Sequence, residues 1–96
     1  MNVDLKDLRE KIDKIDDEMV RLFQERMRVS ADIAEYKKEN GMAVLDKSRE
    51  SQKLSDIESK TDDEFKSYAR ALYSFMFELS RSYQNSLLGE EQNCAQ

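Results

Sequence analysis

The sequence predicts an all-α fold made of three helices, one long, one short and one medium-long. The chain of 96 residues contains no proline and only two glycines, Gly41 and Gly89, so few positions interrupt a helix. Its apolar residues recur in steps of three and four, which places them on one face of a helix. The length suits a single domain. We expect that domain to cover residues 1–89 and residues 90–96 to form a disordered carboxy-terminal tail.

The first predicted helix is the long one and runs from about Asp4 to Asn40. Gly41 follows it, and Lys37 and Lys38 lie in its last turn, where positive charge suits the helix dipole. At ~1.5 Å per residue, this helix would be about 55 Å long. Its apolar stripe consists of Leu5, Leu8, Ile12, Ile15, Met19, Leu22, Val29, Ile33 and Tyr36. Because a chain this small cannot cover the whole stripe, we expect a second copy of the chain to cover it, in an intertwined homodimeric helical bundle.

The second predicted helix is short and follows an apolar loop over residues 42–45. Asp46 stands where a side-chain oxygen can accept a hydrogen bond from the first free backbone N–H groups of that helix. Leu54 and Ile57 lie on one side of it, three residues apart. We expect this side to be buried.

The third predicted helix begins at about Asp62 and ends at Gly89. Thr61 and Glu64 have the spacing of a capping box, in which the two side chains satisfy backbone N–H groups at the helix start. We expect its buried side to be a stripe of large apolar residues. This stripe consists of Phe65, Tyr68, Leu72, Met76, Leu79, Tyr83 and Leu87.

Composition argues against several classes of protein. A net charge of −5 does not suit a nucleic-acid-binding surface, which normally carries a basic excess. No apolar run approaches the roughly 20 residues that span a bilayer, so we expect no membrane partner. The first residues lack the basic and apolar segments of a signal peptide, and the only cysteine, Cys94, excludes an internal disulfide. We therefore expect a cytoplasmic protein.

Arg26 interrupts the apolar seam of the long helix, at a position that Leu22 and Val29 predict to be apolar. A guanidinium at a helical interface needs an anion there, because an unpaired buried charge is strongly destabilising. Lys37 lies eleven residues later, within about 20° of the same face. Arg26 therefore needs an anion nearby, and Lys37 brings a second cation to the same face.

Polar groups also adjoin the apolar sides of the other two helices. Each has a structural explanation when taken alone: a helix cap, an exposed ion pair, or a hydrogen bond to the backbone. An arginine at a seam can likewise set the register of a coiled coil. Their occurrence together suggests a common site. These groups are Asp46, Arg49 and Glu50 on the second helix and Ser80 and Gln84 on the third.

From about Leu5 to Leu88, the chain resembles the all-α class of chorismate mutases. Residues 8–12 (Leu-Arg-Glu-Lys-Ile) are similar to the amino-terminal signature of that family, with Asp16 one turn on. Residues 46–50 fit its Asp-x-x-Arg-Glu motif, and residues 78–80 with Gln84 fit its last helix. Many members have a proline and a basic residue just before the Asp-x-x-Arg-Glu motif, whereas Ala-Val-Leu stands here at residues 43–45.

The resemblance implies that the chain rearranges chorismate to prephenate, in phenylalanine and tyrosine biosynthesis. This pericyclic step requires neither a nucleophile nor a metal or other cofactor, and we expect none. It requires that the substrate be held in its compact conformer and that charge on its ether oxygen be stabilised. The resemblance implies that Arg26 and Arg9 clamp the two carboxylates of the substrate and that Ser80 supports a carboxylate. It further implies that Lys37 and Gln84 donate hydrogen bonds to the ether oxygen. By the same resemblance, Glu50 and the backbone near Asp46 hold the ring hydroxyl, and Arg49 orders the loop.

Helix geometry places Arg9 in the site of the other subunit. Arg9 and Arg26 are 17 residues apart, about 25 Å along a straight helix. Chorismate is far smaller than this distance, and no helix breaker lies between the two residues. We therefore expect Arg9 to act in the partner's site, as the family resemblance also implies, so that catalysis requires the homodimer.

Three other functions remain compatible with the sequence. The first is an isochorismate–pyruvate lyase, which uses a similar set of cations. The second is a regulatory module that binds chorismate or prephenate, or a mutase domain fused to or in complex with another aromatic-pathway enzyme. The third is a helical interaction module, in which the seam charges only set the register and no small ligand binds.

Overall fold

The computed structural model describes residues 4–89. The chain forms three α-helices, α1 (Leu5–Glu39), α2 (Lys47–Lys60) and α3 (Lys66–Leu88), with a short 3₁₀ helix, η1 (Asp63–Phe65), before α3. Within the described part of the chain there is no strand, so the predicted all-α class is confirmed. None of these helices combines the length and the apolar character that crossing a bilayer requires.

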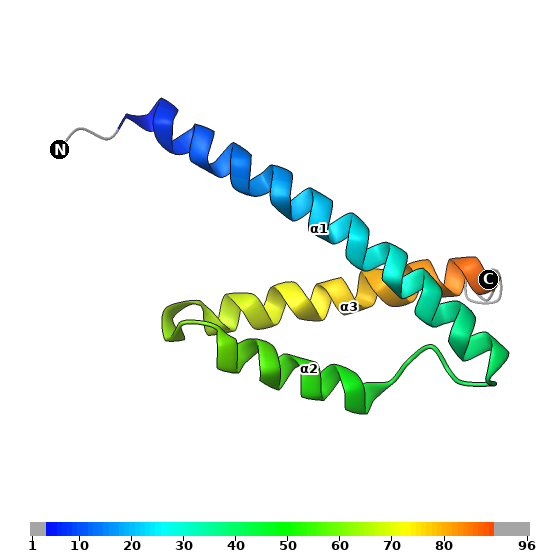
Figure 1. Cartoon of the computed structure of the whole chain (residues 1–96). Helices are drawn as coiled ribbons and strands as arrows, with labels where there is room; N and C mark the ends of the chain where they lie inside the picture. The colour runs from blue at the N-terminus through cyan, green and yellow to red at the C-terminus, as the bar shows by residue number, and fades with distance from the viewer. Residues whose placement is uncertain (1–3, 90–96) are drawn as a thin grey trace, which may run out of the picture.

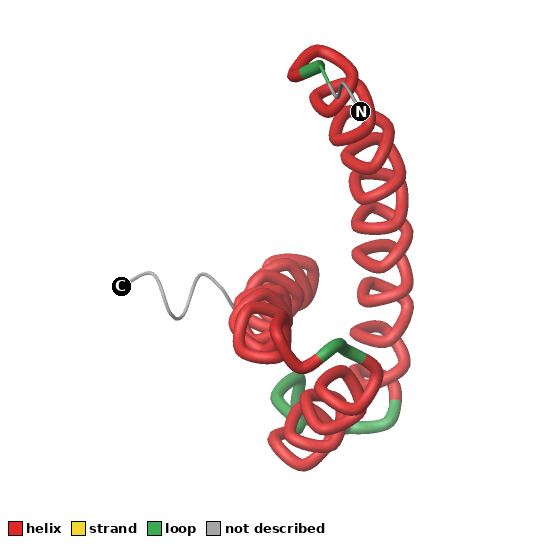
Figure 2. The backbone as a smooth tube through the Cα atoms, turned by 90° about the vertical axis from the view of Figure 1, so that its left-hand side faces the viewer, coloured by secondary structure: helices red, strands yellow, loops and turns green. Residues whose placement is uncertain are grey.

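The helices α2 and α3 form an antiparallel hairpin, and the carboxy-terminal half of α1 crosses α3 (Figure 1). No Cα atom of α1 lies within 8 Å of a Cα atom of α2, so both helices pack on α3 and not on each other. The amino-terminal half of α1 extends away from the hairpin, as is also visible in the view along α3 (Figure 2). The molecule measures 59 × 25 × 25 Å as a result. Within residues 4–89, the amino-terminal end of α1 therefore lies clear of the other helices.

The end of α1 is a Schellman motif, which confirms the predicted stop. Gly41 has a φ of 64°, in the left-handed region where glycine lacks the steric penalty of other residues. The Met42 N–H donates to the Lys37 carbonyl at 2.8 Å, and the Gly41 N–H donates to the Lys38 carbonyl at 3.3 Å. These bonds satisfy carbonyls that have no partner within the helix.

The capping box predicted at residues 61–64 is wrong. The Thr61 hydroxyl donates instead to the carbonyl of Ile57, so it helps to end α2. Because η1 intervenes, α3 begins at Lys66 rather than near residue 62. The predicted end of this helix is confirmed, since Gly89 has a φ of 79° and its N–H donates to the Ser86 carbonyl at 3.3 Å.

The core of the single chain is small and lies where α1 crosses α3. Within residues 4–89, its buried apolar residues are Ala34 and Phe77. Tyr73 packs edge-on against Phe77, with 6.3 Å between the ring centroids. Leu54 and Ile57 of α2 are half-buried, on the side predicted to face inward.

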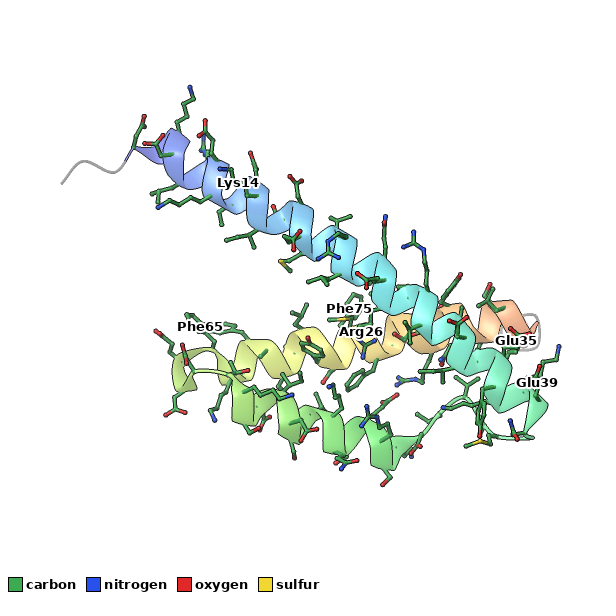
Figure 3. The ribbon with its side chains drawn as sticks, viewed as in Figure 1. Lys14, Arg26, Glu35, Glu39, Phe65 and Phe75 are labelled. Atoms are coloured by element: carbon green, nitrogen blue, oxygen red, sulfur yellow. The ribbon has the colours of Figure 1, made fainter. Side chains whose placement is uncertain are left out.

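The apolar stripe predicted for α3 is not the face that packs within the chain. Leu72, Leu79 and Tyr83 are exposed, whereas Phe77, which the predicted stripe omits, is buried. The stripe of α1 is likewise exposed from Leu5 to Tyr36. Exposed apolar surface of this extent marks an interaction surface. Figure 3 shows the extended half of α1, with Lys14, clear of the other helices.

Ion pairs on this extended half lie along the surface of α1. Arg21 contacts Glu18 and Glu25 at 3.0 and 2.9 Å, one turn away on either side. The hydrogen bond from Arg21 lowers the pKa of the Glu18 carboxyl. All three side chains are well exposed, so these pairs add little to stability.

Candidate functional site

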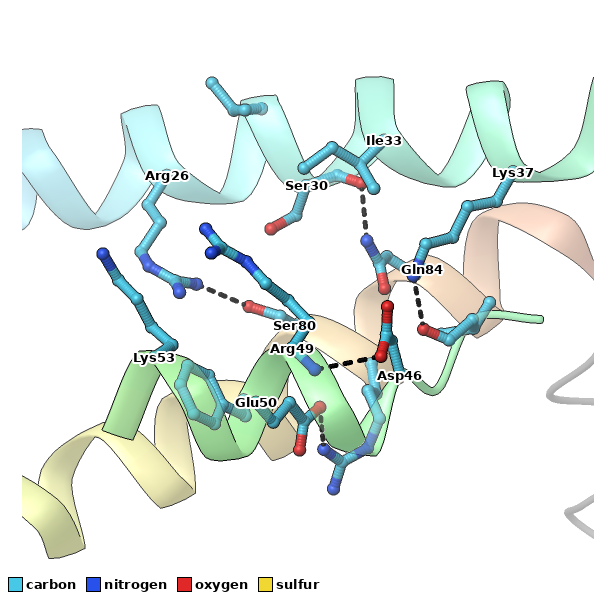
Figure 4. A pocket seen from close by; sticks show the side chains of 14 residues that line it. Arg26, Ser30, Ile33, Lys37, Asp46, Arg49, Glu50, Lys53, Ser80 and Gln84 are labelled. Carbon is cyan, nitrogen blue, oxygen red and sulfur yellow. Dashed lines mark hydrogen bonds and ion pairs between the residues drawn. The ribbon is translucent and has the colours of Figure 1, made fainter. Parts of the chain in front are cut away.

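A pocket of about 340 Å³ lies between α1, α2 and α3, beside the point where α1 crosses α3 (Figure 4). It forms because α1 and α2 both pack on α3 but not on each other. Seven of the eight residues predicted for the site line it. These are Arg26 and Lys37 of α1, Asp46 in the loop before α2, Arg49 and Glu50 of α2, and Ser80 and Gln84 of α3.

Arg26 enters the pocket from α1 as a half-buried guanidinium. Its Nη1 donates to the Ser80 hydroxyl at 3.1 Å, and its Cζ lies 5.7 Å from the centroid of the Phe77 ring. The ring face attracts a cation at this distance, so Phe77 helps to hold the guanidinium in place. No carboxylate within residues 4–89 pairs with Arg26, so most of its N–H donors remain available to a ligand.

Gln84 joins α3 to α1 in the floor of the pocket. Its Nε2 donates to the Ser30 carbonyl at 2.9 Å, and both residues are buried. An amide NH₂ group has two donors, so one remains after this bond. The buried polar face of α3 is therefore fixed in place before any ligand enters.

Lys37 stands at the other end of the pocket from Arg26, three turns further along α1 (Figure 4). Its Nζ donates to the Val44 carbonyl at 2.8 Å, which ties the loop before α2 to α1. An ammonium has three donors, so two remain for a ligand. Lys37 is half-buried and Gln84 lies beside it.

Asp46 and Arg49 form the start of α2. The Asp46 Oδ1 accepts a hydrogen bond from the Arg49 N–H at 3.0 Å, which confirms the predicted helix cap. The Arg49 side chain turns toward α1 across the pocket (Figure 4). Its guanidinium has no carboxylate partner in the described part of the chain.

Glu50 does not form an exposed pair with its neighbour Arg49. Its Oε2 instead accepts a hydrogen bond from Nη1 of Arg81, at 2.5 Å. Both side chains are half-buried, at 27% and 29% exposed, so solvent screens this pair less than a surface pair. The ion pair joins α2 to α3 along one wall of the pocket.

The pocket carries an excess of three positive charges, although the whole chain has a net charge of −5. Two carboxylates line it, and both already accept hydrogen bonds, from a backbone N–H and from Arg81. The pocket thus suits a ligand with more than one negative charge. The five cations are Arg26, Lys37, Arg49, Lys53 and Arg81.

Arg9 lies apart from this pocket, exposed on the extended half of α1. The helix is unbroken from Leu5 to Glu39, so Arg9 stands almost five turns from Arg26. The pocket of its own chain is therefore out of its reach. Its contribution to the site of a partner stays a prediction.

Lys53 and Arg81 line the pocket but are not among the site residues predicted from the sequence. A signal for Lys53 was present, because it follows Arg49 by four residues and so shares its helix face. Arg81 had no such signal, since its direction depends on how α2 packs against α3. Phe77, the ring beneath Arg26, was omitted from the predicted stripe, although it lies one turn before Arg81.

The chain matches the model of a known protein family. The model of the family described as chorismate mutase type II matches residues 8–85, which is most of the chain. Searches against curated proteins and against solved structures found no significant match. Members of the matched family are isomerases that act on chorismate. The chain therefore belongs to the chorismate mutase type II family.

Proposed function

We propose that this chain catalyses the rearrangement of chorismate to prephenate for phenylalanine and tyrosine biosynthesis, as an intertwined homodimer. The observation that carries the proposal is the pocket of about 340 Å³ with its uncompensated cations. A volume near the lower end of the range for small-molecule sites suits a compact ligand. Chorismate is such a ligand and carries two carboxylates.

In this proposal, the pocket acts by restricting the substrate and by stabilising charge. Arg26, which the Phe77 ring and the Ser80 hydroxyl hold in place, binds one carboxylate. The partner's Arg9 binds the other carboxylate. Held at both ends, the flexible substrate stays in the compact conformer in which its reacting carbons are close.

Lys37 and Gln84 would stabilise the ether oxygen as its bond to carbon breaks. Both lie at the end of the pocket away from Arg26, and each has donors left after its bond within the chain. Donors that are already fixed need no rearrangement when charge develops, which is what lowers the barrier. The bonds to Val44 and Ser30 supply that fixation.

The remaining residues would orient the substrate ring. Only Oε2 of Glu50 is used by Arg81, so Oε1 is free to accept the ring hydroxyl. The backbone near Asp46 would contact the same hydroxyl. Ser80 would support the carboxylate held by Arg26, and Arg49 would order the loop before α2. Arg81 would then be a positioning residue, acting through Glu50.

The test is the turnover of chorismate by alanine variants of the two residues proposed to contact the ether oxygen. Lys37→Ala and Gln84→Ala should each lower kcat on the order of 10²-fold or more, because each removes a fixed donor. Lys38→Ala is the matched control, since this exposed lysine is the next residue of α1 and does not line the pocket. A loss below about tenfold for the two pocket variants would contradict these roles.

The same assay separates the other functions. Isochorismate offered beside chorismate would reveal a lyase through the release of pyruvate. Low activity that rises strongly when another aromatic-pathway enzyme is added would indicate a regulatory or fused module. A helical interaction module would bind no bicyclic transition-state analogue in a calorimetric titration.

A further inference from the structure

Lys53 is a cation of the pocket that the roles proposed above leave unused. It is half-buried on α2, one turn after Arg49, and its side chain turns toward α1 (Figure 4). Within residues 4–89, no carboxylate lies within 4 Å of its amine and no hydrogen bond fixes it. A lysine side chain is long enough to reach water from most half-buried positions. Its direction here therefore needs an explanation.

The surroundings of Lys53 are those of an anion site. Arg26, Arg49 and Lys53 reach the same end of the pocket from two different helices. Like charges at a half-buried site repel one another, and solvent screens that repulsion only in part. The two carboxylates of the pocket are engaged elsewhere, by the cap of α2 and by Arg81. An anion from outside the chain would offset this repulsion.

We propose that Lys53 is a specificity-determining residue that binds the same substrate carboxylate as Arg26. This inference rests on the proposed function and extends it, because it names a second contact for one carboxylate. Lys53 lies at the end of the pocket opposite Lys37 and Gln84, which are assigned to the ether oxygen. It therefore contributes to binding the dianion and not to stabilising the transition state. Such a residue changes KM and leaves kcat nearly unchanged.

The test compares Lys53→Gln with Lys60→Gln. Lys60 is the matched control, because it lies on α2 seven residues further on, on nearly the same helix face, and outside the pocket. Lys53→Gln should raise KM for chorismate about three- to tenfold, the range expected for a partly exposed charged hydrogen bond, with kcat within about twofold. Lys60→Gln should change neither constant, and Lys53→Arg should recover most of the lost affinity.

Ionic strength supplies a second readout. The KM of the unmodified enzyme should rise more steeply with salt than that of Lys53→Gln, since a charge at the edge of a site attracts its ligand over a distance that salt shortens. Equal KM values for the Lys53 and Lys60 variants would overturn the proposal. A loss of activity in Lys53→Gln that is confined to kcat would also overturn it. A weaker dimer in Lys53→Gln would overturn it as well, because it would show that Lys53 pairs with an acidic residue of a second copy.

Failure of this inference is distinguishable from failure of the proposed function. Calorimetry with a bicyclic dicarboxylate transition-state analogue measures binding without turnover. If the enzyme does not convert chorismate but binds the analogue, and Lys53→Gln weakens that binding, the function is wrong and the Lys53 site stands. If chorismate is converted and Lys53→Gln behaves like Lys60→Gln, only the Lys53 site is wrong. If the chain neither converts chorismate nor binds the analogue, both the proposed function and the Lys53 site are rejected.

Discussion

The two halves of α1 have similar amphipathic sequences and opposite surroundings. In the carboxy-terminal half, Ser30 and Ala34 are buried against α3, and Arg26 and Lys37 line the pocket. In the amino-terminal half, every side chain from Leu5 to Glu25 is exposed, and Leu5 and Ile15 are 57% and 55% exposed. The helix itself continues through both halves without a break. The difference therefore lies in what each half packs against.

Side-chain size explains which half packs within the chain. Ser30 and Ala34 are small and one turn apart, so α3 can approach the backbone of α1 closely. Large side chains such as Ile12 and Met19 keep a neighbouring helix further away and expose more area. Burial of that area is favourable in proportion to its size. The extended half thus has more to gain from a partner than the half that is already packed.

The largest expected effects come from two single substitutions, one of an arginine in each half of α1. Arg9→Ala and Arg26→Ala should each lower kcat/KM on the order of 10²-fold or more, because each removes a multi-donor clamp from a carboxylate. Mixing the two inactive variants should restore roughly a quarter of the unmodified activity. Half of the dimers are then mixed, and each mixed dimer has one intact site of two.

The measurement is the initial rate of chorismate consumption after the variants are mixed, unfolded and refolded together. Refolding each variant alone is the control for recovery of structure. Activity that does not rise on mixing would contradict the assignment of Arg9 to the partner's site. Nearly full activity of Arg9→Ala alone would remove Arg9 from the site altogether.

A smaller effect is expected from one charge placed on the exposed apolar stripe. Ile15→Asp should weaken the dimer by about tenfold or more, because it places an unpaired carboxylate in the interface. Lys14→Asp is the matched control, as the neighbouring residue on another face of α1. Sedimentation measures the dissociation constant. A dimer equally strong in both variants would show that this stripe is not its interface.

The stability of the unmodified chain should depend on its concentration for the same reason. Its Tm should rise with protein concentration, because a ligand or a partner that binds only the folded state stabilises that state. Calorimetric scans over a hundredfold range of concentration test this. A Tm that does not change with concentration would indicate that the small core around Ala34 and Phe77 stabilises the folded single chain without a partner.

The smallest expected effect is that of pH on the unmodified enzyme. Gln84 donates its hydrogen bond at any pH, so kcat should change less than about twofold between about pH 5 and pH 8. Gln84→Glu should instead lose activity as pH rises, since only the protonated acid donates. A steep fall in the unmodified enzyme over this range would contradict the role of Gln84 at the ether oxygen.

Most of the fold was predictable because helix signals are local. The stop at Gly41 and the cap at Asp46 depend on bonds between residues at most five apart. The capping box at residues 61–64 failed because Thr61 had two local partners, and the end of the preceding helix took its hydroxyl. Local sequence cannot decide between two such competing bonds.

The sequence alone determined the three helices, the anomaly of Arg26 and, through helix length, the distance of Arg9 from its own pocket. Periodicity shows which residues share a helix face, because rise and rotation per residue are constant. It does not show which helix covers that face. Tertiary structure alone decided that α3 packs through Phe77 and that Arg81 binds Glu50, since each depends on the relative placement of two helices.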